Sequence, residues 1–235
     1  QVKKNKEEDI IRYAAAVKNL SVAYFRDGKS DEALASARQS VNIYSRVANA
    51  KSFEYKSRLA SSLITYANRL EEQGQGEEAL TIALQAVNIY RALNKSKPAE
   101  YGHQLAFALN SYASCLDNLG RTDEAIVAAK ESLDLYCGIT LETPEELKEE
   151  VAIVFNNYAN FLDAEGRDEE ALAAAKKTMG VFQELAISAP NRFQSQYAMS
   201  LHNYSSYLSA QGKELEALEV IQQSLNIYKD LAELR

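Results

Sequence analysis

The sequence predicts an all-α protein, a right-handed superhelical solenoid made of five antiparallel helix pairs. Three sets of residues that recur every 46 positions support this prediction. The first is a set of glycines: Gly28, Gly74, Gly120, Gly166 and Gly212. The second is an alanine five residues after each glycine, and the third is the set of prolines: Pro98, Pro144 and Pro190. A fixed period of this length is typical of stacked helical repeats rather than of a single compact core.

We expect one repeat array over residues 1–235, with units at approximately 6–51, 52–97, 98–143, 144–189 and 190–235. The third unit shows how each is built. After Pro98, apolar residues recur at helical spacing until Gly120: Leu105, Ala106, Leu109, Ala113 and Leu116. Proline is tolerated in a first helical turn, and glycine adopts the left-handed conformation that caps a helix end. The sequence therefore predicts a first helix, called helix A, that ends at each repeated glycine.

A second helix, called helix B, follows each glycine at once. In the third unit Thr122 can cap it, and Asp123 and Glu124 suit the positive end of its dipole. Its apolar stripe continues through Ala125, Ala129, Ser132, Leu133, Tyr136 and Ile139. Because the link between the helices is so short, the two must run antiparallel. The fourth unit opens with Thr143-Pro144-Glu145-Glu146, the pattern of a capping box.

Aromatic residues repeat on helix B at one position: Tyr44, Tyr90, Tyr136, Phe182 and Tyr228. They could form a stacking platform for bases or sugars, but they continue the apolar stripes, so we interpret them as rings packed between helices. The last helix B keeps this stripe through Leu218, Ile221, Leu225 and Tyr228 and has no polar outer face. Terminal repeats normally need one. The sequence therefore predicts self-association through the C-terminal helix, or its coverage by a further segment.

Composition excludes several classes of function. A net charge of −7 argues against a nucleic-acid-binding protein, which needs a basic face. No apolar run reaches the roughly 20 residues that cross a membrane, and nothing resembles a secretory signal. We expect Cys115 and Cys137 to be free thiols in a reducing, cytoplasmic compartment. His103 and His202 lie in different units without a catalytic partner motif, and no metal-ligand spacing occurs, so we expect no enzyme activity, cofactor or metal.

The helix pairs resemble the tetratricopeptide repeat. This resemblance is carried by the turn Leu119-Gly120-Arg121-Thr122-Asp123-Glu124-Ala125, by small residues at Ala113 and Ser132, and by Tyr112 and Leu116 on helix A. The 46-residue units exceed the standard length of 34. Long units and Asn-rich segments such as residues 155–160 resemble the arrays of kinesin light chains and the sensor arrays of intracellular receptors.

Such an array would line its concave groove with helix A. The face of helix A outside the core carries amides, carboxylates and one histidine: Asn68, Asn110, Asn156, Asn160, Glu71, Asp117, Asp163 and His202. An asparagine can bind both the N–H and the C=O of an extended peptide, and the resemblance implies this use here. The carboxylates favour basic peptide side chains. Alternatively, the asparagines are polar residues tolerated on a solvated face.

These observations favour a non-catalytic protein–protein interaction scaffold or sensor, with a signalling role, that holds a peptide or partner segment in the groove. The alternative is a structural spacer or oligomerisation module that makes its contacts through its ends.

Overall fold

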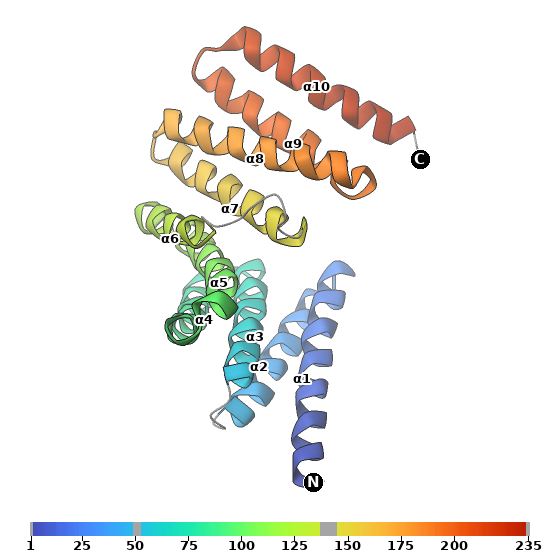
Figure 1. Ribbon diagram of the computed structural model, residues 1–235, viewed down its shortest axis with the longest axis vertical. Helices are drawn as coiled ribbons and strands as arrows, with labels where there is room; N and C mark the ends of the chain where they lie inside the picture. The colour runs from blue at the N-terminus through green and yellow to red at the C-terminus, as the bar shows by residue number, and fades with distance from the viewer. Residues whose placement is uncertain (1, 49–52, 137–144, 234–235) are drawn as a thin grey trace. The chain divides into compact units, whose positions relative to one another are not determined.

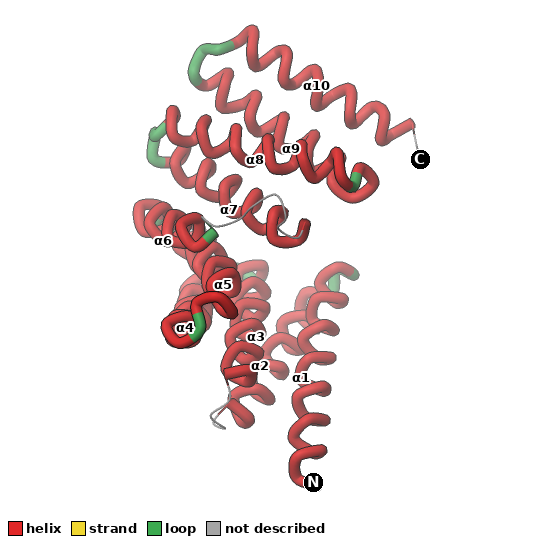
Figure 2. The backbone as a smooth tube through the Cα atoms, viewed as in Figure 1, coloured by secondary structure: helices red, strands yellow, loops and turns green. Residues whose placement is uncertain are grey.

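The computed structural model describes residues 2–48, 53–136 and 145–233, and all of these ranges are helical apart from short turns (Figures 1 and 2). Ten helices lie in them, and no strand does. Their bounds are α1 Val2–Arg26, α2 Ser30–Ala48, α3 Phe53–Glu72, α4 Gly76–Ser96, α5 Pro98–Asn118, α6 Thr122–Leu135, α7 Glu145–Ala164, α8 Asp168–Ser188, α9 Pro190–Ala210 and α10 Glu214–Glu233. The predicted all-α fold of helix pairs is confirmed.

The chain divides into two compact units, Gln1–Arg121 and Thr122–Arg235. Within the first unit, each helix from α1 to α4 contacts the next helix along the chain, and within the second unit each helix from α6 to α9 does the same. The boundary falls in the turn between helices A and B of the third predicted repeat. Three B helices, α2, α4 and α8, are therefore packed between their own helix A and the following one.

The repeated glycines end helix A as predicted. All five have positive φ angles, between 68° and 75°. At Gly74, the Gly74 N–H donates to the Glu71 carbonyl (2.8 Å) and the Gln75 N–H donates to the Leu70 carbonyl (2.9 Å). These bonds satisfy carbonyls at the helix end that have no intrahelical partner. The same pair of bonds recurs at Gly28, Gly120, Gly166 and Gly212.

Two of the three prolines are confirmed in the first helical turn, since α5 begins at Pro98 and α9 begins at Pro190. The predicted capping box of the fourth unit lies at residues 143–146, and its first two members are outside the described residues. Cys137 and Ile139 are outside them as well. Cys115 is a buried free thiol, as expected.

The core of each pair follows the repeat. The alanine after each glycine is buried where the two helices approach, and so are the helix B aromatic rings of the first four units. A buried serine adds a hydrogen bond to the packing. The Ser40 hydroxyl donates to the Ala14 carbonyl (3.0 Å), and the Ser224 hydroxyl donates to the Ala198 carbonyl (2.7 Å). Because these residues are repeat equivalents, the first and last pairs are joined in the same way.

Candidate functional site

The predicted groove residues are distributed over four A helices. Asn68 and Glu71 lie on α3, Asn110 and Asp117 on α5, Asn156, Asn160 and Asp163 on α7, and His202 on α9. The first two helices belong to the first unit and the last two to the second. The structure gathers Asn68, Glu71 and Asn110 around one cavity. It places Asn156 and Asn160 where α7 meets α9, and His202 beside α10.

A cavity of about 510 Å³ lies between α3 and α5. All of its lining residues except the exposed Phe107 have polar side chains: Asn68, Arg69, Glu71, Glu72, Asn110, Ser111, Ser114 and Asn118. The Asn118 amide donates to the Glu71 carboxylate at 2.8 Å, which fixes that carboxylate in the wall. Asn68 is half-buried, whereas Asn110 is 7% exposed. Asn68 therefore offers a ligand more surface than Asn110 does. We call this the α3–α5 cavity.

Arg69 is the unusual residue of the α3–α5 cavity. Only 8% of it is exposed, and its guanidinium lies 3.7 Å from the centre of the Phe25 ring of α1. One nitrogen pairs with Glu72 at 3.1 Å, but Nε and Nη1 are buried without a hydrogen-bond partner. Burial lowers the pKa of Arg69 and raises that of Glu72, against their mutual attraction. Buried N–H groups without acceptors are costly, and an oxygen in the cavity would satisfy them only if the guanidinium turned toward it.

Cys115 lies behind the same wall. Burial raises the pKa of its thiol, and the nearby charge of Glu71 raises it further. Since the thiolate is the reactive form of cysteine, these surroundings keep Cys115 an inert core residue.

Side-chain hydrogen bonds bridge the contact between α7 and α9. The Asn203 amide donates to the Asn156 oxygen at 3.1 Å, and the Tyr207 hydroxyl donates to the Asn160 oxygen at 2.7 Å. Burial, with the nearby charge of Asp163, raises the pKa of Tyr207 to about 12. This hydroxyl therefore stays a donor at neutral pH. Each asparagine uses its oxygen within the protein and keeps its amide N–H groups for other partners.

His202 lines a smaller cavity of about 260 Å³ on the other side of α9, together with Ile221, Leu225 and Tyr228 of α10. It therefore faces the apolar side chains of the last helix.

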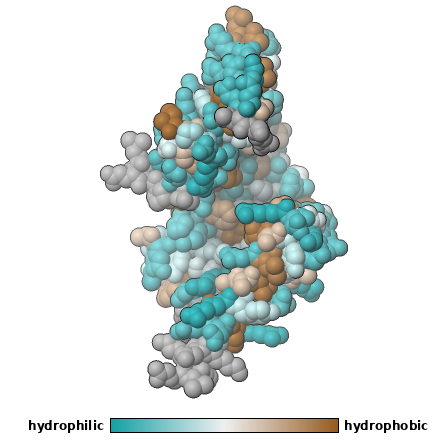
Figure 3. All heavy atoms as spheres, turned by 90° about the vertical axis from the view of Figure 1, so that its right-hand side faces the viewer, coloured by the Kyte–Doolittle hydropathy of each residue, from teal (hydrophilic) through white to brown (hydrophobic). Residues whose placement is uncertain are grey.

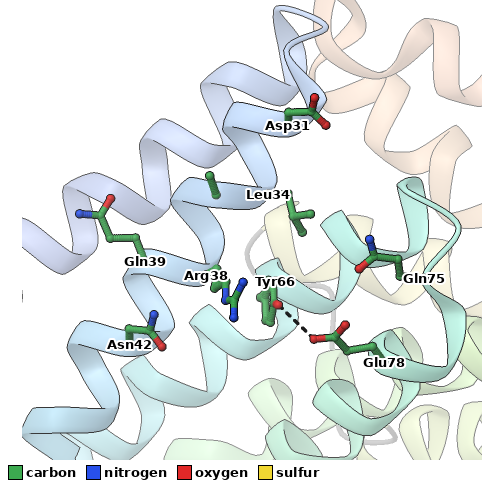
Figure 4. Close-up of a pocket in the computed structure, with 9 residues that line it drawn as sticks. Asp31, Leu34, Arg38, Gln39, Asn42, Tyr66, Gln75 and Glu78 are labelled. Carbon is green, nitrogen blue, oxygen red and sulfur yellow. Dashed lines mark hydrogen bonds between the residues drawn. The ribbon is translucent and has the colours of Figure 1, made fainter.

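A further cavity, of about 580 Å³, lies between α2 and α4 (Figure 4). The Tyr66 hydroxyl donates to Glu78 at 3.2 Å there, and Arg38 lies beside the ring. Burial and the Glu78 charge raise the pKa of Tyr66, while Arg38 lowers it. This cavity opens between B helices, away from the asparagines of helix A.

Among the site residues that were not sequence-based candidates, four make the interactions that characterise these contacts: Arg69, Asn118, Asn203 and Tyr207. A signal exists for one of them, because the position nine residues before each glycine is always polar: Asn19, Thr65, Ser111, Asn157 and Asn203. Arg69 also departs from its repeat. Its counterparts in the other units are Ala23, Cys115, Phe161 and Tyr207.

Within the described ranges, no group of three histidine, cysteine or acidic residues is arranged to hold a metal ion. None of the described helices has the length and apolar character that a membrane span requires.

Comparison with known proteins agrees with the geometry of the helix pairs. Residues 14–54 and 59–99 match the tetratricopeptide repeat family model. The sequence matches no curated protein. Among solved structures, the kinesin light chain nearly identical TPR-like repeats of Podosopora anserina are similar, with a TM-score of 0.68 and 19% identity over 94% of this chain and 97% of that one.

BtubC from P. vanneervenii gives a TM-score of 0.67 and 14% identity, over 96% of this chain and 92% of that one. A Rap protein complexed with Competence and Sporulation Factor gives a TM-score of 0.56 and 18% identity, over 96% of this chain and 66% of that one. Two segments in the first half of the chain thus match the tetratricopeptide repeat model, and over nearly its whole length the chain has the fold of kinesin light chain-like tetratricopeptide repeat proteins.

Proposed function

We propose that this protein is a non-catalytic scaffold or sensor that binds an extended peptide segment of a partner on helix A, with the α3–α5 cavity as the main site. Folds built from tetratricopeptide repeats are typical of protein–protein interaction scaffolds. The observation that carries the proposal is the polar wall of this cavity, in which amides, a carboxylate and an arginine with unpaired N–H groups line one space.

The wall offers complementary groups to a peptide backbone. The Asn68 amide and Arg69 can donate to peptide carbonyl oxygens, and the side chains of Ser111 and Ser114 can accept from peptide N–H groups. Contacts to the backbone hold a chain without reading its side chains. Two carboxylates are close in the structure or the sequence: Glu71 lies in the same wall, and Asp117 lies on the same helix as those serines. They would favour a basic side chain on the peptide, as would the net charge of −7.

In the second unit, Asn156 and Asn160 offer N–H donors of their own to a peptide, and Asp163 follows three residues after Asn160 on α7. Their oxygens already accept bonds from Asn203 and Tyr207. We therefore assign them a smaller share of the binding than Asn68 and Arg69. His202, which faces α10, would take no part in this peptide contact. The similar fold of a Rap protein has been solved in complex with a factor, which supports ligand binding by an array of this kind.

The test is a screen of immobilised peptides containing lysine or arginine, followed by calorimetric titration of the best binder. Each lost hydrogen bond should cost about 0.5–1.5 kcal/mol, so the double variant Asn68→Ala/Arg69→Met should weaken binding about 5- to 150-fold. The variant Asn156→Ala/Asn160→Ala should have a smaller effect. Asn88→Ala, an exposed asparagine on helix B, is the matched control and should bind like the natural chain.

The stability of these variants separates binding from folding. Arg69→Met places an apolar chain where three other units have an apolar residue or cysteine. It removes two buried N–H groups without partners, which offsets the loss of the ion pair with Glu72 and of the contact with the Phe25 ring, so the melting temperature should change little. If the Asn68→Ala/Arg69→Met variant bound the peptide as tightly as the natural chain, the α3–α5 cavity would not be the binding site. If no peptide binds, a second function takes precedence: a cytoplasmic module that associates through its ends, which the exposed apolar side of α10 favours.

A further inference from the structure

The outer side of α10 is apolar and exposed. Leu215, Leu218, Leu225 and Tyr228 are 80%, 63%, 59% and 42% exposed. Their spacing of three, seven and three residues places them on one side of the helix. We call these four residues the C-terminal face. Hydrophobic side chains are visible at the end of the second unit where α10 lies (Figure 3). Leu215 adds to this face where every other unit has an acidic residue: Asp31, Glu77, Asp123 and Glu169.

The helix position of Tyr228 is buried inside the array, and the positions of Leu218 and Leu225 are buried or half-buried there. The counterparts of Tyr228 that the following helix A covers include Tyr44 and Phe182, which are 2% and 6% exposed. Tyr44 packs against Tyr55 and Leu59 of α3, and Phe182 packs against Phe193 and Tyr197 of α9. The C-terminal face is therefore one half of an internal repeat joint. What the joint requires is a helix A with apolar residues at the positions of Leu59 and Tyr197.

The outer side of α1 carries that other half. Tyr13, the repeat equivalent of Leu59 and Tyr197, is 54% exposed, and Leu20, the equivalent of Tyr66, is 43% exposed. Ala16 lies between them and is also exposed, although its equivalents in the other units are buried: Ser62, Ala108, Val154 and Ser200. We call Tyr13, Ala16 and Leu20 the N-terminal face.

The two helices have opposite charge. The sequence of α1 contains six basic residues (Lys3, Lys4, Lys6, Arg12, Lys18, Arg26) and three acidic ones (Glu7, Glu8, Asp9), a net charge of +3. The sequence of α10 contains one basic residue (Lys229) and five acidic ones (Glu214, Glu216, Glu219, Asp230, Glu233), a net charge of −4. In an antiparallel joint, the basic end of α1 at Arg26 would lie next to the acidic start of α10. This arrangement also suits the two helix dipoles.

We propose that the C-terminal face of one chain binds the N-terminal face of a second copy of this chain, head to tail, in the geometry of an internal repeat joint. Apolar complementarity and opposite charge are both satisfied by this occupant. Such a contact joins two different surfaces, so each added copy leaves one free face of each kind, and the assembly lengthens as concentration rises unless the rotation between copies closes a ring. Salt weakens it, because the attraction between exposed charges is screened.

The test is sedimentation of the 235-residue chain from micromolar to millimolar concentration, with two variants: Leu225→Asp, which disrupts the C-terminal face, and Tyr13→Asp, which disrupts the N-terminal face. The natural chain should grow in mass with concentration, and each variant alone should stay monomeric. An equimolar mixture of the two variants should form a one-to-one dimer and nothing larger, because each variant retains one intact face.

Control variants distinguish loss of the head-to-tail contact from unfolding and from association through other surfaces. Ile187→Asp introduces the same charge at another exposed apolar residue, on α8, and should associate like the natural chain. Circular dichroism should show the native helix content in every variant, and Leu218→Asp replaces Leu225→Asp if the latter unfolds. Three results would overturn the proposal: a natural chain that is monomeric throughout, a Tyr13→Asp variant that still self-associates through α10, or a variant mixture that stays monomeric.

Discussion

Two contacts between A helices, α3 with α5 and α7 with α9, occupy the same place in the repeat but differ in construction. Between α3 and α5 the side chains leave a cavity of about 510 Å³. Between α7 and α9, asparagine and tyrosine side chains reach across and bond to one another. The position five residues before the glycine accounts for much of this difference. It holds Tyr207 in the last unit and Arg69, with two nitrogens unpaired, in the second.

This comparison shows that the repeat determines where a side chain lies, while its chemistry determines whether the site is open or closed. A closed contact uses its polar groups for folding stability. An open one leaves them for a ligand, at the expense of buried groups without partners. We therefore expect binding to depend on the first unit and side-chain hydrogen bonding between A helices to stabilise the second.

The turns should be the element in which the two units do not differ. Gly74 and Gly166 have φ angles of 71° and 68° and make the same backbone hydrogen bonds. A β-branched side chain is strained in this conformation, so Gly74→Val and Gly166→Val should each lower the free energy of unfolding by about 1–3 kcal/mol. Urea denaturation measures both losses. A loss confined to one of them would mean that the turns, and not only the walls, distinguish the units.

A smaller loss of unfolding free energy should distinguish the α7–α9 contact from the α3–α5 cavity. Tyr207→Phe removes the hydroxyl that donates to Asn160 but keeps the ring. Because Asn160 is exposed, water can replace the lost donor, and the expected loss is about 0.5–1.5 kcal/mol of unfolding free energy. Peptide affinity at the α3–α5 cavity should not change. The matched replacement in the first unit, Arg69→Met, should do the reverse, with lower affinity and little change in stability. Reduced peptide binding by Tyr207→Phe would contradict the division of roles.

The sequence predicted the backbone features of this fold because they are local. A positive φ angle at Gly120 follows from glycine's lack of a side chain, and the burial of Ala125 follows from a short turn between two helices. The exposure of Leu218, Leu225 and Tyr228 followed from comparing the last unit with the earlier ones. These inferences need only the period and the helical spacing.

The details of the site depend on contacts between residues about 47 positions apart, which a helical pattern does not specify. Asn118 and Glu71 bond because two long side chains from successive A helices reach each other. The same holds for Asn203 with Asn156. The sequence placed Asn110 on the groove face, but only its packing shows how little of it is exposed. Arg69 could have been noticed as a break in the repeat, yet its unpaired nitrogens depend on the surrounding side chains.

The smallest predicted effect concerns two glycines inside helices, one in each unit. Gly102 lies in α5 and Gly180 in α8, and neither has a positive φ angle. A side chain at Gly180 would meet nothing within 4 Å, whereas one at Gly102 would meet the Asn94 oxygen at 3.7 Å, an ordinary contact. Alanine at such positions restricts the unfolded chain and favours the helix by about 0.4–1 kcal/mol.

We therefore expect Gly180→Ala to raise the free energy of unfolding by this amount. Gly102→Ala should raise it by less, because its methyl group would further enclose the Asn94 oxygen, which is already buried without a partner. Since both sites lie away from the asparagines of helix A, neither change should alter peptide affinity. Urea denaturation of the two variants and of their combination measures the gains, which should add because the sites belong to different units. A destabilising Gly180→Ala would mean that α8 is packed more tightly at this position than α5 is at Gly102.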